Sequence, residues 1–160
     1  KSTGEVMGID KDFHTAFFKS QTAAGINLPK KGTVFLSVKN KDKKELIFIA
    51  KKLIKLGFEL LGTKGTCDFL NKNNILINKI NKISEGNPHI IDLLESKKIV
   101  LVINTTEGKT SAGDSYIMRR NTLLTNTPYY TTIKGAEAAI NSIEKLKNLD
   151  LRVRCLQSIH

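Results

Sequence analysis

The sequence is poor in several residue types on which common sites and scaffolds depend. Its 160 residues include no tryptophan, three prolines and two cysteines. Cys67 and Cys155 lie far apart, without a CxxC pair or an adjacent histidine. Neither a zinc site nor a disulfide framework is indicated, so a reducing, cytoplasmic location is expected. With 40% hydrophobic and 26% charged residues, the chain is expected to be globular rather than fibrous or disordered.

Long hydrophobic runs are also missing. No apolar run approaches the roughly 20 residues that a membrane-spanning helix needs. The longest candidates have the length of a strand, such as Ile99–Ile103, so no membrane partner is expected. The first residues are polar and do not resemble a secretory signal. Because the chain does not begin with Met, it is expected to be a processed product or a piece of something longer.

Charge of one sign is in excess, with a formal net charge of +11. A basic surface can attract nucleic acid, small phosphate-bearing molecules or acidic partners. The lysines are spread over the whole chain, without a long basic block, an RNP-type aromatic pattern or zinc-finger spacing. Nucleic acid is therefore not an expected partner, and a compositional bias toward Lys, Asn and Ile accounts for part of the charge.

The N-terminal part of the chain is expected to be helical. The segment Asp12–Gly25 places Phe13, Ala16 and Phe17 near one helical face and ends on glycine, as a helix with a C-terminal glycine would. The Pro and Gly of Asn27–Gly32 interrupt this pattern. A domain boundary is expected there, dividing the chain into residues 1–30 and 31–160.

From Thr33 onward, short apolar or β-branched runs alternate with helical stretches. The expected strands are residues 33–38, 58–62, 75–77, 99–103, 128–130 and 152–157. The expected helices are residues 42–56, 66–71, 89–96, 111–124 and 135–146. The first of these is expected to begin with a capping-box pair and to bury one apolar face: the pair is Asp42 and Glu45, and the face is Ile47, Ala50, Leu53 and Ile54. The alternation predicts right-handed βαβ crossovers and a doubly wound α/β sheet, with the aliphatic run Ile99–Ile103 as a central parallel strand.

Four of the loops that follow strands carry hydroxyls, amides, glycines and lysines. They are residues 39–43, 63–66, 104–109 and 131–132. Ligands of such sheets bind beyond the carboxyl ends of the strands. Glycine lets the backbone approach an anion, Thr hydroxyls and free N–H groups donate hydrogen bonds, and Lys supplies charge. Each loop alone also fits a plain turn or helix cap, but their convergence predicts a phosphate site.

A catalytic set is not apparent. A hydrolase or transferase would need a paired acid and base, a nucleophile with a base, or a metal cluster. His14, His89 and His160 are isolated in the sequence. Asp114 fits a first-turn carboxylate favoured by the helix dipole, and Cys67 fits a small buried residue. No catalytic residue and no metal ligand is therefore expected.

Four segments resemble, in order and spacing, the C-terminal domain of bacterial glutamine-hydrolysing carbamoyl-phosphate synthase large chains. They are Thr63–Thr66, Glu85–Ile90, Asn104–Gly108 and Asp114–Arg120, of which the EGxPH and INTTxG runs are the most specific. The resemblance implies a methylglyoxal-synthase-like fold for residues 31–160, with three α/β/α layers and a mostly parallel five-stranded sheet. Ser2–Asp10 looks like the end of the preceding synthetase domain, which implies that residues 1–30 are its tail and a linker.

In this family the domain is regulatory. The resemblance implies that UMP, an inhibitor, and IMP, an activator, compete for one phosphate site. The effectors would control ATP-dependent synthesis of carbamoyl phosphate from glutamine and bicarbonate, for arginine and pyrimidine biosynthesis. The implied nucleotide site consists of Ser37, Lys43, Thr63, Thr66, Lys82, Asn104, Thr106 and Lys109.

Ornithine is the second effector that the resemblance implies, through Tyr129 and Thr131. The chain departs from the family beside them, at Pro128 and Tyr130, where the family carries Asp and His. The remaining ornithine ligands would lie in the synthetase portion of the subunit.

The domain itself is expected to be non-catalytic and to hold no cofactor, whereas the full-length subunit is expected to use ATP, magnesium and potassium. Its expected partners are the rest of the large subunit, the glutaminase small subunit and further copies of the enzyme.

The alternative is a methylglyoxal synthase, which shares the fold and acts on dihydroxyacetone phosphate with a catalytic Asp. The acidic loop and DPL-like segment of that enzyme are not found at Asn87–His89 and Glu107–Lys109.

Overall fold

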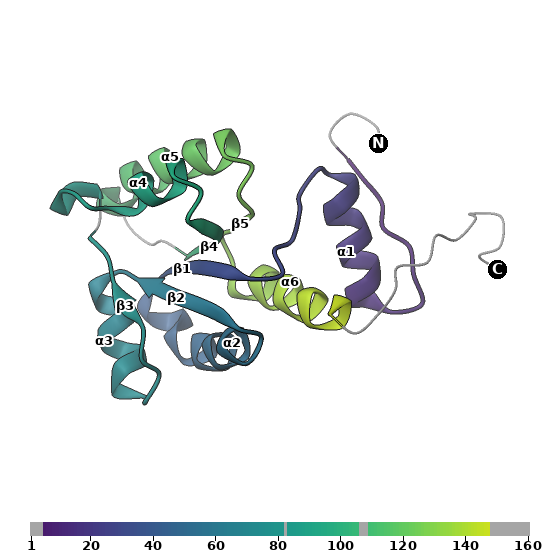
Figure 1. Cartoon of the computed structure of the whole chain (residues 1–160), viewed down its shortest axis with the longest axis horizontal. Helices are drawn as coiled ribbons and strands as arrows, with labels where there is room; N and C mark the ends of the chain where they lie inside the picture. The colour runs from purple at the N-terminus through teal and green to yellow at the C-terminus, as the bar shows by residue number, and fades with distance from the viewer. Residues whose placement is uncertain (1–4, 82, 106–108, 148–160) are drawn as a thin grey trace.

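The computed structural model in Figure 1 describes residues 5–81, 83–105 and 109–147. Its strands are β1 (Gly32–Val38), β2 (Phe58–Gly62), β3 (Asn78–Lys79), β4 (Ile99–Thr105) and β5 (Tyr129–Tyr130). Its α-helices are α1 (Phe13–Ala23), α2 (Lys43–Lys55), α3 (Lys64–Lys72), α4 (Ile90–Glu95), α5 (Lys109–Leu124) and α6 (Ile133–Leu146). Two single-turn 3₁₀ helices, η1 (Asn40–Asp42) and η2 (Ile83–Glu85), lie in loops. No helix in these ranges is both long and apolar enough to cross a membrane.

The strands form one parallel sheet in the order β3-β2-β1-β4-β5. From β1 the chain winds outward through β2 to β3, and then returns to the other side of β1 to place β4 and β5. The direction of winding therefore reverses between β1 and β4, where Ser37 pairs with Asn104 and Val38 with Thr105. In open α/β sheets a ligand crevice lies beyond the carboxyl ends of the strands at such a reversal.

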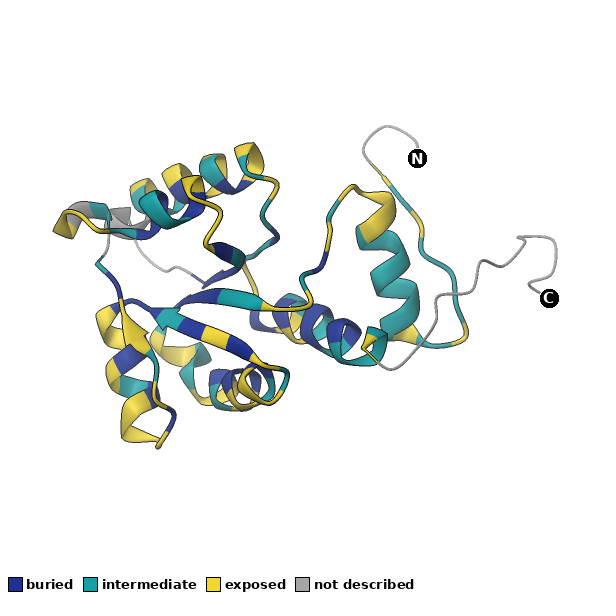
Figure 2. Ribbon diagram, in the orientation of Figure 1, coloured by how far each residue is buried: buried dark blue, intermediate teal, exposed yellow. Residues whose placement is uncertain are grey.

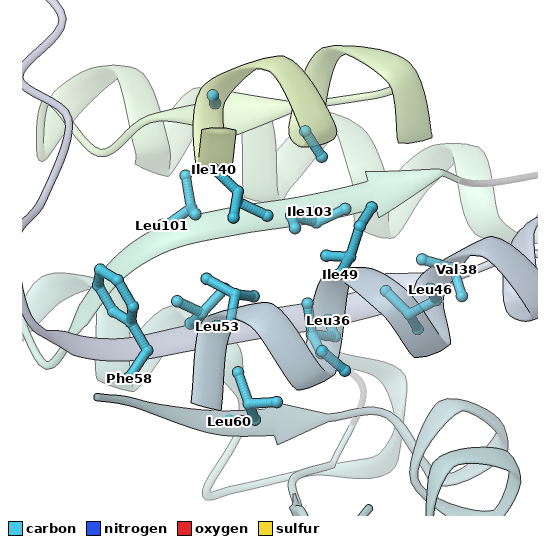
Figure 3. Packing of buried hydrophobic residues seen from close by; sticks show 14 of the residues in the cluster. Leu36, Val38, Leu46, Ile49, Leu53, Phe58, Leu60, Leu101, Ile103 and Ile140 are labelled. Carbon is cyan, nitrogen blue, oxygen red and sulfur yellow. The ribbon is translucent and has the colours of Figure 1, made fainter. Parts of the chain in front are cut away.

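Helices cover both faces of the sheet, because alternate residues of each strand point to opposite sides. One face, built on Leu36 and Ile103, packs against α2 and α6 in the larger hydrophobic cluster (Figure 3). The opposite face, built on Phe35 and Val102, packs against α4 and α5. Figure 2 shows the resulting pattern, with buried residues along the sheet and on the inward sides of the helices. The three-layer α/β/α fold predicted from the sequence is confirmed, and β4 lies inside the sheet as its aliphatic run indicated.

The helix α1 lies beside α6, away from the sheet (Figure 1). The carboxylate of Asp12 caps α1 by accepting a hydrogen bond from the backbone N–H of Thr15 at 2.9 Å. Its other oxygen lies 2.8 Å from Nζ of Lys145 at the end of α6. The hydroxyl of Ser142 on α6 also donates to the backbone carbonyl of His14 at 2.9 Å. The helix predicted over Asp12–Gly25 is confirmed, and Gly25 follows it with φ of +84°.

The attachment of α1 to α6 is expected to weaken in acid. The side-chain bond to Lys145, followed by the bonds from Thr15, holds the pKa of Asp12 well below its ordinary value. A depressed carboxyl pKa contributes stability above the unfolded-state pKa, near 4, that is lost as the pH falls toward the folded-state pKa. Urea unfolding should show Asp12→Asn less stable than the parent at pH 6, with a smaller difference at pH 2 than at pH 6. An equal difference at both pH values would show that the carboxylate charge is irrelevant.

Two local predictions for α2 are wrong. The helix begins at Lys43, after η1, and the backbone of Asp42 is helical (φ −91°, ψ −8°) rather than extended. From that conformation the Asp42 side chain makes no cap bond, so the capping box with Glu45 does not form. Ala50 and Leu53 are buried as predicted, and Leu46 and Ile49 complete the buried face of the helix. Ile47 is only partly buried and Ile54 is 46% exposed, so the buried face is rotated about the helix axis from the predicted one.

The strand predicted at residues 75–77 is also misplaced. Asn74 takes a left-handed conformation (φ +59°), and Ile75 turns into the core. The backbone N–H of Ile77 donates to the side chain of Asn71 rather than to a neighbouring strand. Pairing with β2 begins only at Asn78. The strand predicted at residues 152–157 lies outside the described residues.

Candidate anion site at the carboxyl edge of the sheet

The carboxyl ends of β1 and β4 are joined just beyond the last paired residues. The backbone N–H of Lys39 donates to both the carbonyl oxygen (3.0 Å) and the hydroxyl (3.2 Å) of Thr105. Thr105 is 1% exposed, so this junction is buried. It fixes the first turn after β1 at the point where the winding of the sheet reverses.

The helix α3 begins directly after β2 with an uncapped first turn. Thr63 has the extended backbone of an N-cap residue (φ −64°, ψ 156°), but its side chain makes no bond to the helix N–H groups. Instead its hydroxyl donates to the hydroxyl of Thr66 at 3.4 Å. The first N–H groups of a helix have no carbonyl partner within it, and they carry the positive end of the helix dipole. The N–H groups of Lys64 and Gly65 are therefore placed to bind an anion.

Thr66 ties this turn to the central strand. Its side chain is buried (1% exposed), and its hydroxyl oxygen accepts a hydrogen bond from the backbone N–H of Val38 at 3.2 Å. Because the hydroxyl of Thr63 also donates to it, Thr66 acts as an acceptor in both contacts. Its own hydroxyl hydrogen meets no acceptor in the part of the chain that the structure describes, so it remains to be donated.

Lys43, the first residue of α2, brings its ammonium to the same turn. A Cβ atom on Gly65 would lie 3.7 Å from Nζ of Lys43. The two carboxylates nearest in the sequence are already engaged: Asp42 lies 4.0 Å from Nζ of Lys39, and Glu45 lies 3.8 Å from Nζ of Lys134. No other carboxylate of the described residues forms an ion pair with Lys43. A cation therefore faces the positive end of a helix, and an anion lying between them would be attracted to both.

A second polar group lies at the end of β4. Asn104 is 2% exposed, and its Nδ2 donates to the hydroxyl of Tyr129 (2.8 Å) and to that of Ser115 (3.2 Å). Its buried Oδ1 finds no donor among the described residues. An unpaired buried polar atom costs about 1–3 kcal/mol, and such atoms are typical of sites that another molecule completes.

The two residues of β5 serve opposite faces of the sheet. Tyr129 accepts the bond from Asn104, and the guanidinium of Arg119 lies 5.8 Å from its ring centroid. Tyr130 points the other way and donates from its hydroxyl to Oε1 of Gln21 on α1 at 3.0 Å. Burial raises the pKa of Tyr130 well above its ordinary value, so its phenol stays protonated and able to donate. Tyr130 therefore connects the sheet to α1.

Comparison with known proteins identifies the family of this chain. The family model of the MGS-like domain matches residues 45–131. This chain belongs to that family. A carbamoyl phosphate synthase large chain of Mesorhizobium japonicum is 48% identical to it over 157 residues, and one of Methanobrevibacter smithii is 50% identical over 156. The C-terminal section of the large chain of Methanopyrus kandleri is 47% identical over 161 residues.

These alignments cover 98–100% of the MGS-like chain but 14%, 15% and 30% of the relatives, so it spans a small part of their length. A crystal structure of methylglyoxal synthase from Elizabethkingia anophelis superposes with a TM-score of 0.55 at 16% identity, covering 71% of this chain and 79% of that one. At that identity the likeness concerns the fold alone. The resemblance drawn from the sequence motifs and the predicted fold class are both confirmed.

The MGS-like domain gathers the predicted site residues into two linked groups. Lys43, Thr63 and Thr66 lie around the start of α3, and Ser37, Asn104 and Tyr129 lie where β1, β4 and β5 end. The bond from Val38 to Thr66 connects the groups. Thr131 is exposed directly after β5. Lys82, Thr106 and the side chain of Lys109 lie outside the described residues.

Three side chains of this region were not foreseen from the sequence. Phe69 lies 5.8 Å from the ammonium of Lys43, Ser115 bonds to Asn104, and Arg119 covers Tyr129. Gly65 and Phe69 are one helical turn apart, so the sequence could have indicated that they share a face of the helix. Ser115 and Arg119 share a face of α5 in the same way, but nothing local indicated which face meets β4 and β5.

The MGS-like domain carries no sign of a nucleophile at Cys67. The thiol is 2% exposed and lies 3.2 Å from the carbonyl oxygen of Gly62 and 3.3 Å from that of Asn78. Burial raises the pKa of this thiol, whereas a reactive cysteine needs a lowered one. The described residues also contain no group of three or more His, Cys, Asp or Glu side chains that could hold a metal ion. Cys67 is a small buried residue, as predicted.

Proposed function

We propose that this MGS-like domain is the effector-binding domain of a carbamoyl phosphate synthase large chain, and that its carboxyl edge binds the phosphate of a nucleotide. One observation carries the proposal: the ammonium of Lys43 faces the uncapped first turn of α3, while the two carboxylates nearest to it in the sequence pair with other lysines. The large-chain relatives, which cover nearly the whole chain, support the assignment to that enzyme.

A phosphate suits this arrangement better than a carboxylate does. It carries up to two negative charges and three terminal oxygens, so it can accept bonds from the first-turn N–H groups, the hydroxyl of Thr66 and the ammonium of Lys43 together. Charge-assisted hydrogen bonds contribute about 1.5–3 kcal/mol each. Ser37, Lys82, Thr106 and Lys109 belong to the proposed site as further contacts.

The proposed ligands are UMP as inhibitor and IMP as activator, competing for the one phosphate site. Ornithine is the second proposed effector, with contacts at Tyr129 and Thr131. In this proposal residues 1–30 are the tail of the preceding synthetase domain and its linker. The full enzyme would use ATP, magnesium and potassium with a glutaminase small subunit to make carbamoyl phosphate for arginine and pyrimidine biosynthesis.

Nucleotide binding is expected to stabilise the chain. Millimolar UMP or IMP should raise its melting temperature, because a ligand that binds only the folded state stabilises it by mass action. Thr66→Ala, and likewise Lys82→Ala, should abolish the shift. Thr122→Ala is the matched control, since Thr122 is equally buried but bonds to a carbonyl within its own helix. Differential scanning calorimetry measures both melting temperatures, and an unshifted parent chain at millimolar nucleotide contradicts the proposal.

The alternative function is that of a methylglyoxal synthase, which the likeness of fold favours. Such an enzyme would bind dihydroxyacetone phosphate at the same edge and would need a catalytic carboxylate beside the phosphate. The two carboxylates next to Lys43 in the sequence are paired with lysines instead. Incubation with dihydroxyacetone phosphate should therefore release no methylglyoxal, and measurable turnover would replace the effector proposal with the catalytic one.

A further inference from the structure

The side chain of Lys43 lies across one face of α3. Gly65 and Phe69 are four residues apart, so they occupy neighbouring places on that face. Nζ of Lys43 lies 3.7 Å from the Cβ position of Gly65 and 5.8 Å from the ring centroid of Phe69. The ammonium is thus held between a position with no side chain and an aromatic ring.

The position of this ammonium needs an explanation, because the start of α3 beside it does not attract a cation. The N-terminal end of α3 is positive and repels a cation. A lysine side chain is also flexible and strongly hydrated, so it ordinarily extends into solvent. The face of an aromatic ring is negative and attracts a cation within about 6 Å of its centroid. Of the described groups around Lys43, Phe69 supplies this attraction.

Phe69 is itself held in place. It is half-buried and packs against the larger hydrophobic cluster under the sheet. A ring fixed in this way can hold the ammonium at one point above the first turn of α3. The absence of a side chain at Gly65 leaves the space that the ammonium occupies, since a longer side chain there would meet Nζ.

We propose that Phe69 is a positioning residue of the anion site, whose ring holds Lys43 over the start of α3 before the anion binds. The inference rests on the proposed function, and it adds the reason why Lys43 is ready to bind. Preorganised side chains raise affinity because less conformational freedom is lost on binding. Phe69 need not touch the ligand.

The test is a double-mutant cycle on UMP affinity, measured by calorimetry on the 160-residue chain. Phe69→Leu keeps an apolar side chain in the cluster but removes the ring, and it should weaken UMP binding about three- to tenfold. Phe69→Tyr keeps the ring and should stay within about twofold of the parent. In a chain that already carries Lys43→Gln, Phe69→Leu should have no further effect on affinity, because the two residues act as one unit.

An equal loss of affinity on Phe69→Leu with and without Lys43 would show a merely structural role and overturn the proposal. If neither UMP nor IMP binds the parent chain, the proposed function fails, and the positioning is still testable without ligand. The ε-methylene protons of Lys43 should show an upfield ring-current shift in the NMR spectrum that Phe69→Leu removes and Phe69→Tyr keeps. Absence of that shift in the parent chain would overturn the positioning role by itself.

Discussion

Replacing Gly65 by aspartate should abolish nucleotide binding and at the same time stabilise the unliganded chain. The new carboxylate would stand at the first turn of α3, beside Nζ of Lys43. There it would take the place that the proposed phosphate occupies, and like charges brought together cost several kcal/mol. The affinity for UMP should therefore fall by more than about a hundredfold, and the nucleotide-dependent rise in melting temperature should disappear.

The gain in stability has the same cause. An acidic residue at a helix N-terminus contributes about 0.3–1 kcal/mol, and Lys43 adds an ion pair that the parent chain lacks. Chemical unfolding of the unliganded variant should therefore show a free energy of unfolding higher by roughly 1 kcal/mol.

Gly65→Asn is the matched control for this variant, because it has the same shape without the charge. It should keep part of the UMP affinity and gain less stability than the aspartate. A Gly65→Asp chain that still binds UMP like the parent would place the phosphate elsewhere on the molecule.

Gly8→Ala should detach the N-terminal segment from α1. The backbone of Gly8 lies directly against that helix: an added Cβ would stand 1.9 Å from the carbonyl oxygen of Ala16 and 2.6 Å from the backbone nitrogen of Ser20. Both obstacles are backbone atoms, which cannot rotate away as a side chain would. Overpacking of this kind costs about 1–3 kcal/mol. Nearby, Nζ of Lys19 holds the same segment by its 2.8 Å ion pair with Asp10, and this contact should be lost with it.

Hydrogen exchange measured by mass spectrometry checks this expectation, because protection should fall in residues 5–24 and remain in the sheet. Gly113→Ala is the matched control: it lies in α5 with open space around its Cβ position, and it should be neutral or slightly stabilising. Unchanged protection of α1 in Gly8→Ala would mean that the segment adjusts without cost.

The order and type of most elements followed from local patterns in the sequence. The bounds of β2 are those predicted, and α1 begins after the capping residue Asp12 that opened the predicted segment. These succeeded because period-2 and helical patterns, turn glycines and helix caps act over a few residues. The failures at Asp42 and at residues 75–77 came where a 3₁₀ turn and a left-handed Asn74 redirect the backbone.

The site could be predicted as a set of loops but not as a geometry. The carboxyl ends of parallel strands meet at one edge, so Thr63 and Asn104 were expected near each other from topology alone. The ammonium of Lys43 lies between Gly65 and Phe69 because of the way α2 packs against α3. That packing cannot be predicted from local sequence patterns. The bond from Tyr130 to Gln21 likewise joins residues 109 positions apart.

The reversal of winding between β1 and β4 also bears on how the chain folds. β1 meets β2 after one short crossover, but it pairs with β4 only after more than 60 residues, as Val34 does with Leu101. Contacts between distant parts of a chain form slowly, because a long loop must close before they stabilise anything. The junction of β1 and β4, where the proposed nucleotide site lies, is thus expected to form late in folding. A bound nucleotide would then report that the whole sheet has assembled.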